Sequence, residues 1–228
     1  MIQLICFDLD DTLMDFHKGE EIAFYETMKE ENIEASMDDY LLYKKINGAL
    51  WKKLEKGEVE RYALQRIRFE ELKKESRLDF DVEKVNALFP QKLSEQAILL
   101  EDSVKILEWC SKKAKLALAS NGTASIQYRR IEKAGIKKYF EYIFISEEVG
   151  YAKPHPAYFD AIFKSANVSP KEVLFIGDSL SADMNGAVES GCISVWFNPK
   201  HIINDSAVIP DHEIDRLSSI IDRWEEFK

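Results

Sequence analysis

At 228 residues, the chain is long enough for one domain with an insertion and for a sizeable buried core. Its 46% hydrophobic and 32% charged residues exclude disorder as the main state. The 41 acidic residues outnumber the 31 basic ones, and the resulting net charge of -10 argues against broad binding to nucleic acid or to an anionic membrane, because both need basic patches. We therefore expect any anionic substrate to be attracted locally, by a metal ion or a few cations.

The sequence shows neither a membrane segment nor a secretory leader. No apolar stretch approaches the length of a membrane span, and Met1 leads directly into an apolar strand pattern without a basic and hydrophobic leader. We expect a cytoplasmic protein without a membrane or nucleic-acid partner. Cys6, Cys110 and Cys192 are odd in number and far apart, so we expect reduced thiols packed as small hydrophobic residues. The sequence does not indicate the oligomeric state.

The first predicted strand ends in a group of acids. Residues 2–7 form an apolar run with one polar interruption, which is typical of a buried parallel strand, and Asp8, Asp10 and Asp11 follow it closely. Open α/β sheets bind ligands at the carboxyl ends of their strands. Two acids at this spacing therefore predict a catalytic site, although Asp is also common in turns and helix caps.

After Leu13 the apolar periodicity becomes helical. Ser36 begins a stretch that resembles a capping box, followed by apolar residues at spacings of three and four. Asp81 is placed to cap another helix, which Pro90 should interrupt or kink. A single crossover between strands does not need so many residues, so we expect a separate helical cap domain over 15–96. The alternative is that these helices cover one face of a sheet.

From Ser103 onward, strands alternate with helices, which predicts right-handed crossovers. The expected fold class is α/β: a doubly wound, Rossmann-like parallel sheet of about five or six strands, formed by residues 1–14 and 97–228. The C-terminal stretch 214–227 is expected to be a packing helix. The later strands are predicted at 116–119, 142–145, 173–176 and 193–196.

Three later stretches add polar groups near the expected strand ends or helix starts. The second strand is followed by Ser120, Asn121 and Gly122; Lys153 stands just before a proline-initiated helix; and the fourth strand runs into Gly177, Asp178 and Ser179, with Asp183 after them. With Asp8-Leu9-Asp10-Asp11-Thr12, this order resembles the DxDxT, S/T, K and GDxxxxD motifs of the haloacid dehalogenase superfamily of phosphohydrolases. The resemblance spans most of the chain, from Asp8 to Asp183.

The resemblance implies a role for each acid. Asp8 would be the nucleophile, because an ionised carboxylate needs no base to attack phosphorus and can form an aspartyl-phosphate. Asp10 would protonate the leaving alkoxide and later deprotonate water. Members of the superfamily that remove halide lack an acid at the position of Asp10, so its presence favours phosphate chemistry. Asp11 departs from the commonest family pattern, which has glycine there, so the local backbone or the cap hinge can differ.

A cluster of acids where a phosphate must bind is unfavourable unless it holds a cation. Carboxylate and carbonyl oxygens suit Mg²⁺, and the family pattern implies Asp8, the backbone carbonyl of Asp10 and Asp178 as its ligands. Asp183 would orient these ligands from the second layer around the ion. The alternatives are that Asp178 caps the helix after it and that Asp183 is an exposed helical acid.

The remaining motif residues would bind the substrate phosphate. Ser120 would donate its hydroxyl, Asn121 and Gly122 would add neighbouring N–H groups, and the Lys153 ammonium would balance charge on the phosphate and on Asp8. A serine before Asn-Gly also suits a plain turn, and a lysine is usually exposed.

The expected function is a Mg²⁺-dependent phosphomonoester hydrolase that acts on a small phosphorylated metabolite. The motif layout is similar to the capped branch that includes pyrimidine 5′-nucleotidases, and the aromatic residues of the cap could stack on a base, so a nucleoside 5′-monophosphate is a candidate substrate. Most of these rings could equally fill the core of the cap. A sugar-phosphate phosphatase, a phosphomutase of the same superfamily and a non-catalytic binding protein remain as alternatives.

Overall fold

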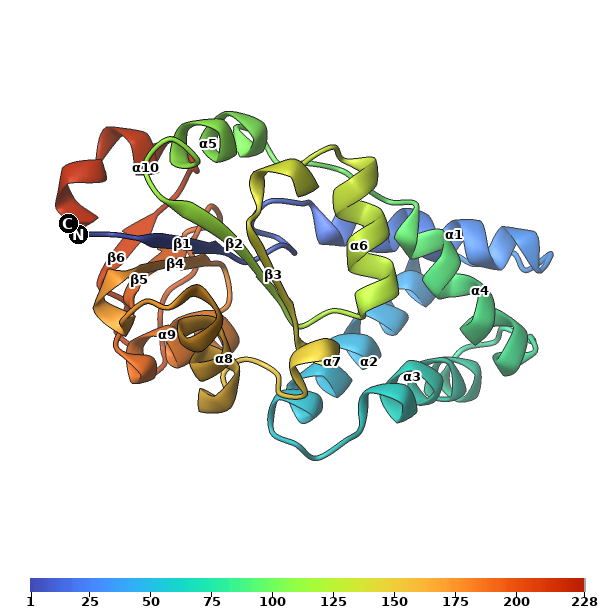
Figure 1. Cartoon of the computed structure of the whole chain (residues 1–228). Helices are drawn as coiled ribbons and strands as arrows, with labels where there is room; N and C mark the ends of the chain where they lie inside the picture. The colour runs from blue at the N-terminus through green and yellow to red at the C-terminus, as the bar shows by residue number, and fades with distance from the viewer. Residues whose placement is uncertain (228) are drawn as a thin grey trace. The chain divides into compact units, whose positions relative to one another are not determined.

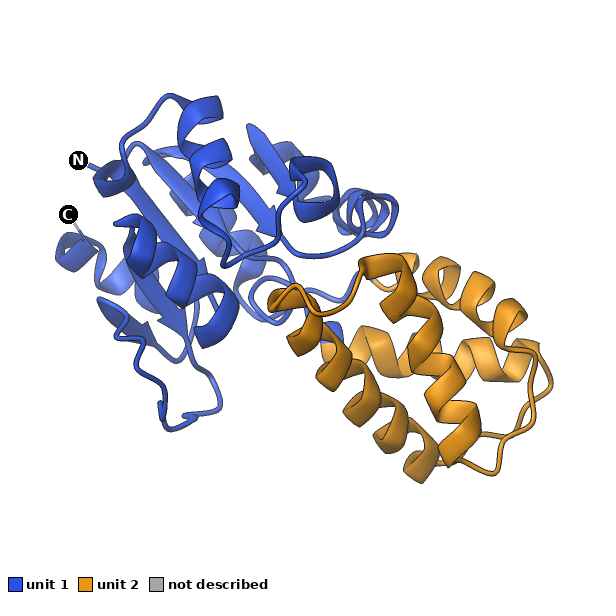
Figure 2. Ribbon diagram, turned by 90° about the horizontal axis from the view of Figure 1, so that it is seen from below, with its two compact units in different colours: residues 1–16, 97–228 blue, residues 17–96 orange. Residues whose placement is uncertain are grey.

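The computed structural model describes residues 1–227 and divides the chain into two compact units. Unit 1 consists of Met1–Phe16 and Ala97–Lys228, and unit 2 is the inserted segment His17–Gln96 (Figure 2). Within residues 1–227, no helix combines the length and the apolar character needed to cross a bilayer. Cys6, Cys110 and Cys192 are buried free thiols, as predicted.

Unit 1 contains a six-stranded, fully parallel sheet, which confirms the predicted fold class (Figure 1). The strand order is β3-β2-β1-β4-β5-β6, so the chain turns from one side of β1 to the other. This arrangement makes the carboxyl end of β1 the switch point at which doubly wound sheets bind ligands. The strands are β1 (Leu4–Phe7), β2 (Lys115–Ser120), β3 (Tyr142–Ile145), β4 (Val173–Gly177), β5 (Ile193–Phe197) and β6 (His212–Ile214).

Helices cover both faces of the sheet. Successive side chains of β1 point to opposite faces, with Ile5 and Phe7 in one apolar cluster and Leu4 and Cys6 in the other. The first cluster includes residues of α5 (Ser103–Cys110), α6 (Ala124–Lys133) and α10 (Ser219–Asp222). The second includes residues of α8 (Pro156–Ala166) and α9 (Asn185–Ser190).

The short α7 (Ser146–Val149) follows β3. Single turns complete the unit: η1 (Lys137–Tyr139), η2 (Pro170–Glu172), the π-helical η3 (Leu180–Met184) and η4 (Trp224–Phe227).

Two sequence expectations differ from the structure. A packing helix over 214–227 was wrong, because Ile214 ends β6 and pairs with Phe197, and only short helical turns follow. A three-residue edge strand is too short to show the alternation that distinguishes a strand from a helix. Pro90 lies inside a helix that continues to Ser94, so the expected interruption was wrong, whereas the alternative of a kink stays a prediction.

Unit 2 is formed by four helices: α1 (Phe16–Glu30), whose first residue belongs to unit 1, α2 (Met37–Glu55), α3 (Arg61–Glu75) and α4 (Val82–Ser94). Ser36 and Asp39 form the capping box that starts α2, and the Asp81 carboxylate caps α4. Aromatic rings fill the core of this unit: Tyr43 packs on Phe69 and Phe89 with centroids about 5.5 Å apart.

The core of unit 2 also contains a buried polar cluster. Nδ2 of Asn47 donates to the Glu20 carboxylate at 2.7 Å, and the Tyr43 hydroxyl lies 3.4 Å from the same oxygen. Nη1 of Arg68 lies 3.3 Å from the Tyr43 hydroxyl and 3.4 Å from Oδ1 of Asn47. The Arg68 guanidinium also covers the Phe89 ring, 4.6 Å from its centroid. Tyr43 and Asn47 of α2 therefore bridge the buried carboxylate of Glu20 in α1 and the buried guanidinium of Arg68 in α3.

Candidate active site

The predicted site residues meet at the carboxyl edge of the sheet in unit 1. Asp8 follows β1, Ser120 ends β2, and Asp178 follows β4. These three strands are neighbours in the sheet, with β1 in the middle. The register of the ladders places the ends of all three at the same level, so their polar groups converge.

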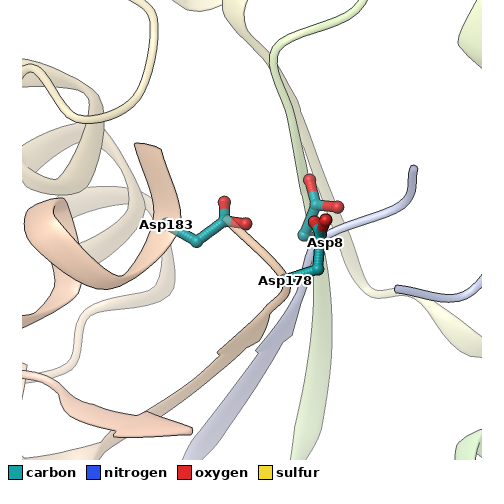
Figure 3. A group of neighbouring side chains, drawn as sticks. All are labelled: Asp8, Asp178 and Asp183. Carbon is teal, nitrogen blue, oxygen red and sulfur yellow. The ribbon is translucent and has the colours of Figure 1, made fainter. Parts of the chain in front are cut away.

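Three acids form the centre of the site. Carboxylate oxygens of Asp8, Asp178 and Asp183 all lie within 4.8 Å of one another (Figure 3). Asp183 reaches the cluster from η3, the kind of π-helical turn that is frequent at functional sites. Asp8 and Asp183 are buried, whereas Asp178 is half-buried.

Local contacts hold Asp183 and Asp178 in this arrangement. A Cβ atom at Gly177 would lie 2.4 Å from an Asp183 carboxylate oxygen, so only glycine permits the close approach. The N–H of Ser179 donates to Oδ2 of Asp183 at 3.1 Å. The Trp196 indole N–H donates to the backbone carbonyl of Asp178 at 2.8 Å. The glycine of the GD motif therefore leaves the room that the Asp183 carboxylate, six residues later, occupies.

Lys153 is buried among these acids. Its Nζ lies 2.6 Å from Asp8 Oδ1, 2.7 Å from Asp183 Oδ1 and 2.6 Å from the carbonyl oxygen of Ala119. Asn121 fixes the backbone of Lys153, because its side-chain amide accepts from the Lys153 N–H at 2.8 Å and donates to the Lys153 carbonyl at 2.9 Å. The Asn121 side chain thus orients the lysine, and the binding of substrate phosphate by the Asn121 N–H stays a prediction.

Burial and mutual repulsion dominate the electrostatics of the acids. Burial raises the pKa of Asp8 from 3.8 to about 8; the Lys153 ammonium opposes this rise, and Asp183 adds to it. Burial, followed by the charges of Asp8 and Asp183, also raises the pKa of Asp178. Burial alone would lower the pKa of Lys153, but the adjacent Asp183 and Asp8 carboxylates outweigh it and leave that pKa raised.

The acids therefore favour binding of a divalent cation. The cluster contains three carboxylates and one ammonium, which contacts two of them, so the ionised cluster carries an excess of negative charge in a poorly solvated place. Oxygen ligands of this kind suit Mg²⁺, which also keeps some of its water ligands. The residues present thus fit the ion that the sequence predicted.

Ser120 is linked to Asp10 through the side chain of Gln127. Ser120 is buried, and its hydroxyl oxygen accepts from the Gly122 N–H at 3.1 Å and from Nε2 of Gln127 at 2.8 Å. A Cβ at Gly122 would lie 2.3 Å from the Gln127 amide nitrogen, so glycine leaves the room that this side chain occupies. The sequence prediction missed Gln127.

Asp10 turns its carboxylate toward α6. Arg130 Nη1 lies 2.5 Å from Asp10 Oδ1, and Gln127 Nε2 donates to Asp10 Oδ2 at 2.7 Å. Gln127 and Arg130 are separated by one helical turn on α6, and both are buried. Their only sequence signal is this spacing three residues apart, shortly after the Ser-Asn-Gly stretch, and many exposed helices show the same pattern.

Asp11 occupies the position at which the family pattern usually has glycine. Its φ is 59°, which is the left-handed region that glycine favours and Asp tolerates. Its Oδ1 accepts from the N–H of Phe16, the first residue of α1, at 3.1 Å. Asp11 therefore keeps a glycine-like backbone and adds a contact at the entry to unit 2.

The profile of one protein family, described as haloacid dehalogenase-like hydrolase, matches residues 2–191. The chain belongs to this family. The HAD-hydrolase YfnB of Bacillus subtilis is 31% identical, covering 95% of this chain and 92% of YfnB. A crystal structure of YfnB bound to magnesium superposes with a TM-score of 0.91, and the match covers 97% of each chain.

Two named pyrimidine 5′-nucleotidases are also similar to this haloacid dehalogenase-like hydrolase. PynA of Streptococcus pneumoniae is 32% identical, covering 96% of this chain and 94% of PynA. YjjG of Escherichia coli is 29% identical, covering 93% of this chain and 96% of YjjG. The similarity to each relative therefore extends over both units.

Proposed function

We propose that this family member is a Mg²⁺-dependent phosphomonoester hydrolase that forms an aspartyl-phosphate on Asp8. The observation that carries the proposal is the contact of a buried Asp8 with the Lys153 ammonium inside a cluster of acids. The relatives that are named nucleotidases support phosphomonoester hydrolysis, and the relative whose structure contains magnesium supports the choice of metal.

The residues divide the chemistry between them. A carboxylate oxygen of Asp8 attacks phosphorus while the ester P–O bond breaks, and the ester oxygen takes a proton from Asp10. Water then attacks phosphorus, Asp10 accepts a proton from it, and the Asp8 carboxylate is released with inorganic phosphate. Ser120 and Lys153 donate hydrogen bonds to the phosphoryl oxygens.

Asp8, Asp178 and the Asp10 carbonyl would hold Mg²⁺, with Asp183 orienting them. When bound, the ion supplies charge neutralisation and polarises the phosphoryl group. The clustering of Asp8, Asp178 and Asp183 supports this assignment.

For the substrate we propose a nucleoside 5′-monophosphate, with pyrimidine nucleotides first. This choice rests on PynA and YjjG, both named pyrimidine 5′-nucleotidases. Sugar phosphates are the main rival. We expect a higher kcat/KM for nucleoside monophosphates than for hexose phosphates or phosphoglycolate. A clear preference for either of the latter would overturn the nucleotidase assignment and leave the phosphatase assignment intact.

The hydrolase proposal is tested by phosphate release with the Asp8→Asn variant as control. This change keeps the shape of the side chain and removes its nucleophilic charge, so we expect kcat to fall at least about 10³-fold. Chelation by EDTA should abolish wild-type activity, and Mg²⁺ should restore it. Near-normal turnover by folded Asp8→Asn protein would contradict the covalent mechanism. Formation of an isomeric phosphate ester without inorganic phosphate would identify a mutase instead.

A further inference from the structure

Asp10 is held from two sides by neighbouring residues of one helix. Arg130 Nη1 contacts Oδ1 of Asp10 at 2.5 Å, and the Gln127 amide donates to Oδ2 at 2.7 Å. Arg130 Nη1 also donates to Oε1 of Gln127 at 2.9 Å, which links the two donors to each other. Both oxygens of the Asp10 carboxylate are thus engaged, and its rotation is restricted by two separate contacts.

The same amide connects Asp10 with the phosphate-binding serine. Nε2 of Gln127 lies 2.7 Å from Asp10 Oδ2 and 2.8 Å from the Ser120 hydroxyl oxygen, and an amide nitrogen has two hydrogens to donate. The separation between the acid and this hydroxyl is therefore set by one side chain, for which Gly122 leaves room.

The two donors are themselves buried and make further contacts. Arg130 is 1% exposed and Gln127 is 2% exposed. The Arg130 guanidinium lies 5.6 Å from the centroid of the Phe16 ring, and the N-terminal turn of α6 is tied to α7 by a hydrogen bond from the Ala124 N–H to the Glu147 carboxylate at 2.8 Å. Burying a guanidinium is unfavourable unless its partners are well placed, so a loosely held Arg130 would be unfavourable here.

We propose that Gln127 and Arg130 are positioning residues for Asp10: together they hold its carboxylate beside Ser120, so that it can protonate the ester oxygen that leaves phosphorus. This inference rests on the proposed hydrolase function and adds two residues to it. As the Asp8–phosphorus bond forms and the ester P–O bond breaks, the electron pair stays on the ester oxygen and the proton of Asp10 moves to that oxygen. A displacement of about 1 Å in a reacting group can cost 10²-fold in rate, so the contacts affect proton transfer without touching the substrate.

Leaving-group dependence separates this role from a general structural one. An aryl phosphate releases a stable phenolate and needs little help from an acid, whereas an alkyl phosphate such as a nucleoside monophosphate releases a basic alkoxide. The quantity to measure is kcat/KM for 4-nitrophenyl phosphate and for the best alkyl phosphate, because it reports only the steps up to leaving-group release. For Arg130→Met and Gln127→Leu, we expect kcat/KM to fall about 100-fold on the alkyl ester and only a few-fold on the aryl ester.

Matched variants complete the experiment. Arg129→Met removes an exposed arginine from the same helix and should leave the aryl-to-alkyl ratio at its wild-type value. Arg130→Lys keeps the charge but loses the planar fork, so its ratio should lie between those of wild type and Arg130→Met. Asp10→Asn defines the ratio without the acid, and adding Gln127→Leu to it should change that ratio no further.

An equal loss on both esters, or a further change of the ratio in the Asp10→Asn background, would overturn the positioning role. If Arg130→Met fails to fold, the aryl-to-alkyl ratios of Gln127→Leu and Arg130→Lys test the positioning role instead. The function is judged separately: wild-type phosphate release that is lost in Asp8→Asn supports the hydrolase whatever the ratios are.

Discussion

Asp8 and Lys153 show how a single buried pair depends on the charges around it. Lys153 lies between Asp8 and Asp183, so one ammonium serves two carboxylates. A charge in such a place is stable only when its partners remain, and Asp178 adds a further carboxylate that Lys153 is not seen to contact. Metal-free protein should therefore respond to pH through these acids.

We predict that metal-free protein loses stability as pH rises from about 4 to about 8. The pKa of Asp8 is raised by burial from 3.8 to about 8, and that of Asp178 is raised as well, so the folded protein retains protons that the unfolded chain releases in this window. The free energy of unfolding then falls with rising pH. The pKa of Lys153 is raised above its ordinary value of 10.5, so its contribution stays constant over the same range.

Urea unfolding at a series of pH values, in EDTA, measures this slope. Asp8→Asn should flatten it, and Mg²⁺ should raise stability most at the upper end of the window, where the cluster is ionised. A free energy of unfolding that increases with pH across the window would show that the acids are already satisfied without metal.

Asp11 provides the second prediction for a single residue. Its φ of 59° favours glycine, whereas its hydrogen bond with the Phe16 N–H needs a side chain that accepts. Asp11→Gly removes the backbone strain but also the bond, so it should cost about 0.5–1 kcal/mol. Asp11→Ala loses the bond and puts a Cβ in the left-handed region, so it should cost about 2 kcal/mol.

Asp11→Asn, which tolerates the same conformation and keeps an acceptor, is the matched control and should stay close to wild type. Chemical denaturation gives the order of the three variants. If the free energy of unfolding of Asp11→Ala equals that of Asp11→Asn, the hydrogen bond to Phe16 contributes nothing to stability.

Among the helices of unit 2, the buried polar cluster is the element that we expect to be most sensitive to substitution. Arg68→Met removes the cation from a cluster that contains Glu20 and Asn47, and removing one member of a buried charged set typically costs about 3–5 kcal/mol. Arg66, on the same helix, makes its ion pairs with Glu70 and Glu83 at the surface, so Arg66→Met should cost less than about 1 kcal/mol.

Circular dichroism during urea unfolding compares the two arginine variants. Equal losses in the free energy of unfolding would mean that the buried Arg68 contributes no more to stability than the exposed Arg66. Methionine would then replace the packing of Arg68 on Phe89 in full.

The sequence predicted best those elements whose signal is local. Parallel strands buried on both faces give continuous apolar runs, so the ends of β1, β2 and β4, and with them Asp8 and Asp178, could be located from the residues alone. Gln127 and Arg130 could not, because α6 reads as an ordinary amphipathic helix and only its packing turns these two polar residues inward. The roles assigned to the acids stay predictions until the variants are measured.

At the scale of the whole molecule, the described groups of the candidate metal site belong to unit 1. Asp8, Asp178, Asp183 and Lys153 all lie in it, whereas unit 2 is the inserted segment His17–Gln96. Mg²⁺ binding should therefore slow hydrogen exchange at the carboxyl ends of β1 and β4 and leave the amides of α2 and α3 nearly unchanged. Mass spectrometry of peptides with and without Mg²⁺ tests this, with Asp178→Ala as the control that should show no protection. Uniform protection across both units would mean that they open together.

The inserted segment leaves and re-enters unit 1 at adjacent points. Met14 pairs with Leu99 in an isolated bridge, and the N–H of Asp15 donates to the carbonyl of Ile98 at 2.9 Å. An insert whose two ends are neighbours can be replaced by another without stretching its host. Residues 17–96 are thus a natural cassette for exchange: a graft from a relative should carry a new substrate preference to the same phosphate chemistry, and lineages can diversify by changing the cassette while the acids around Asp8 remain.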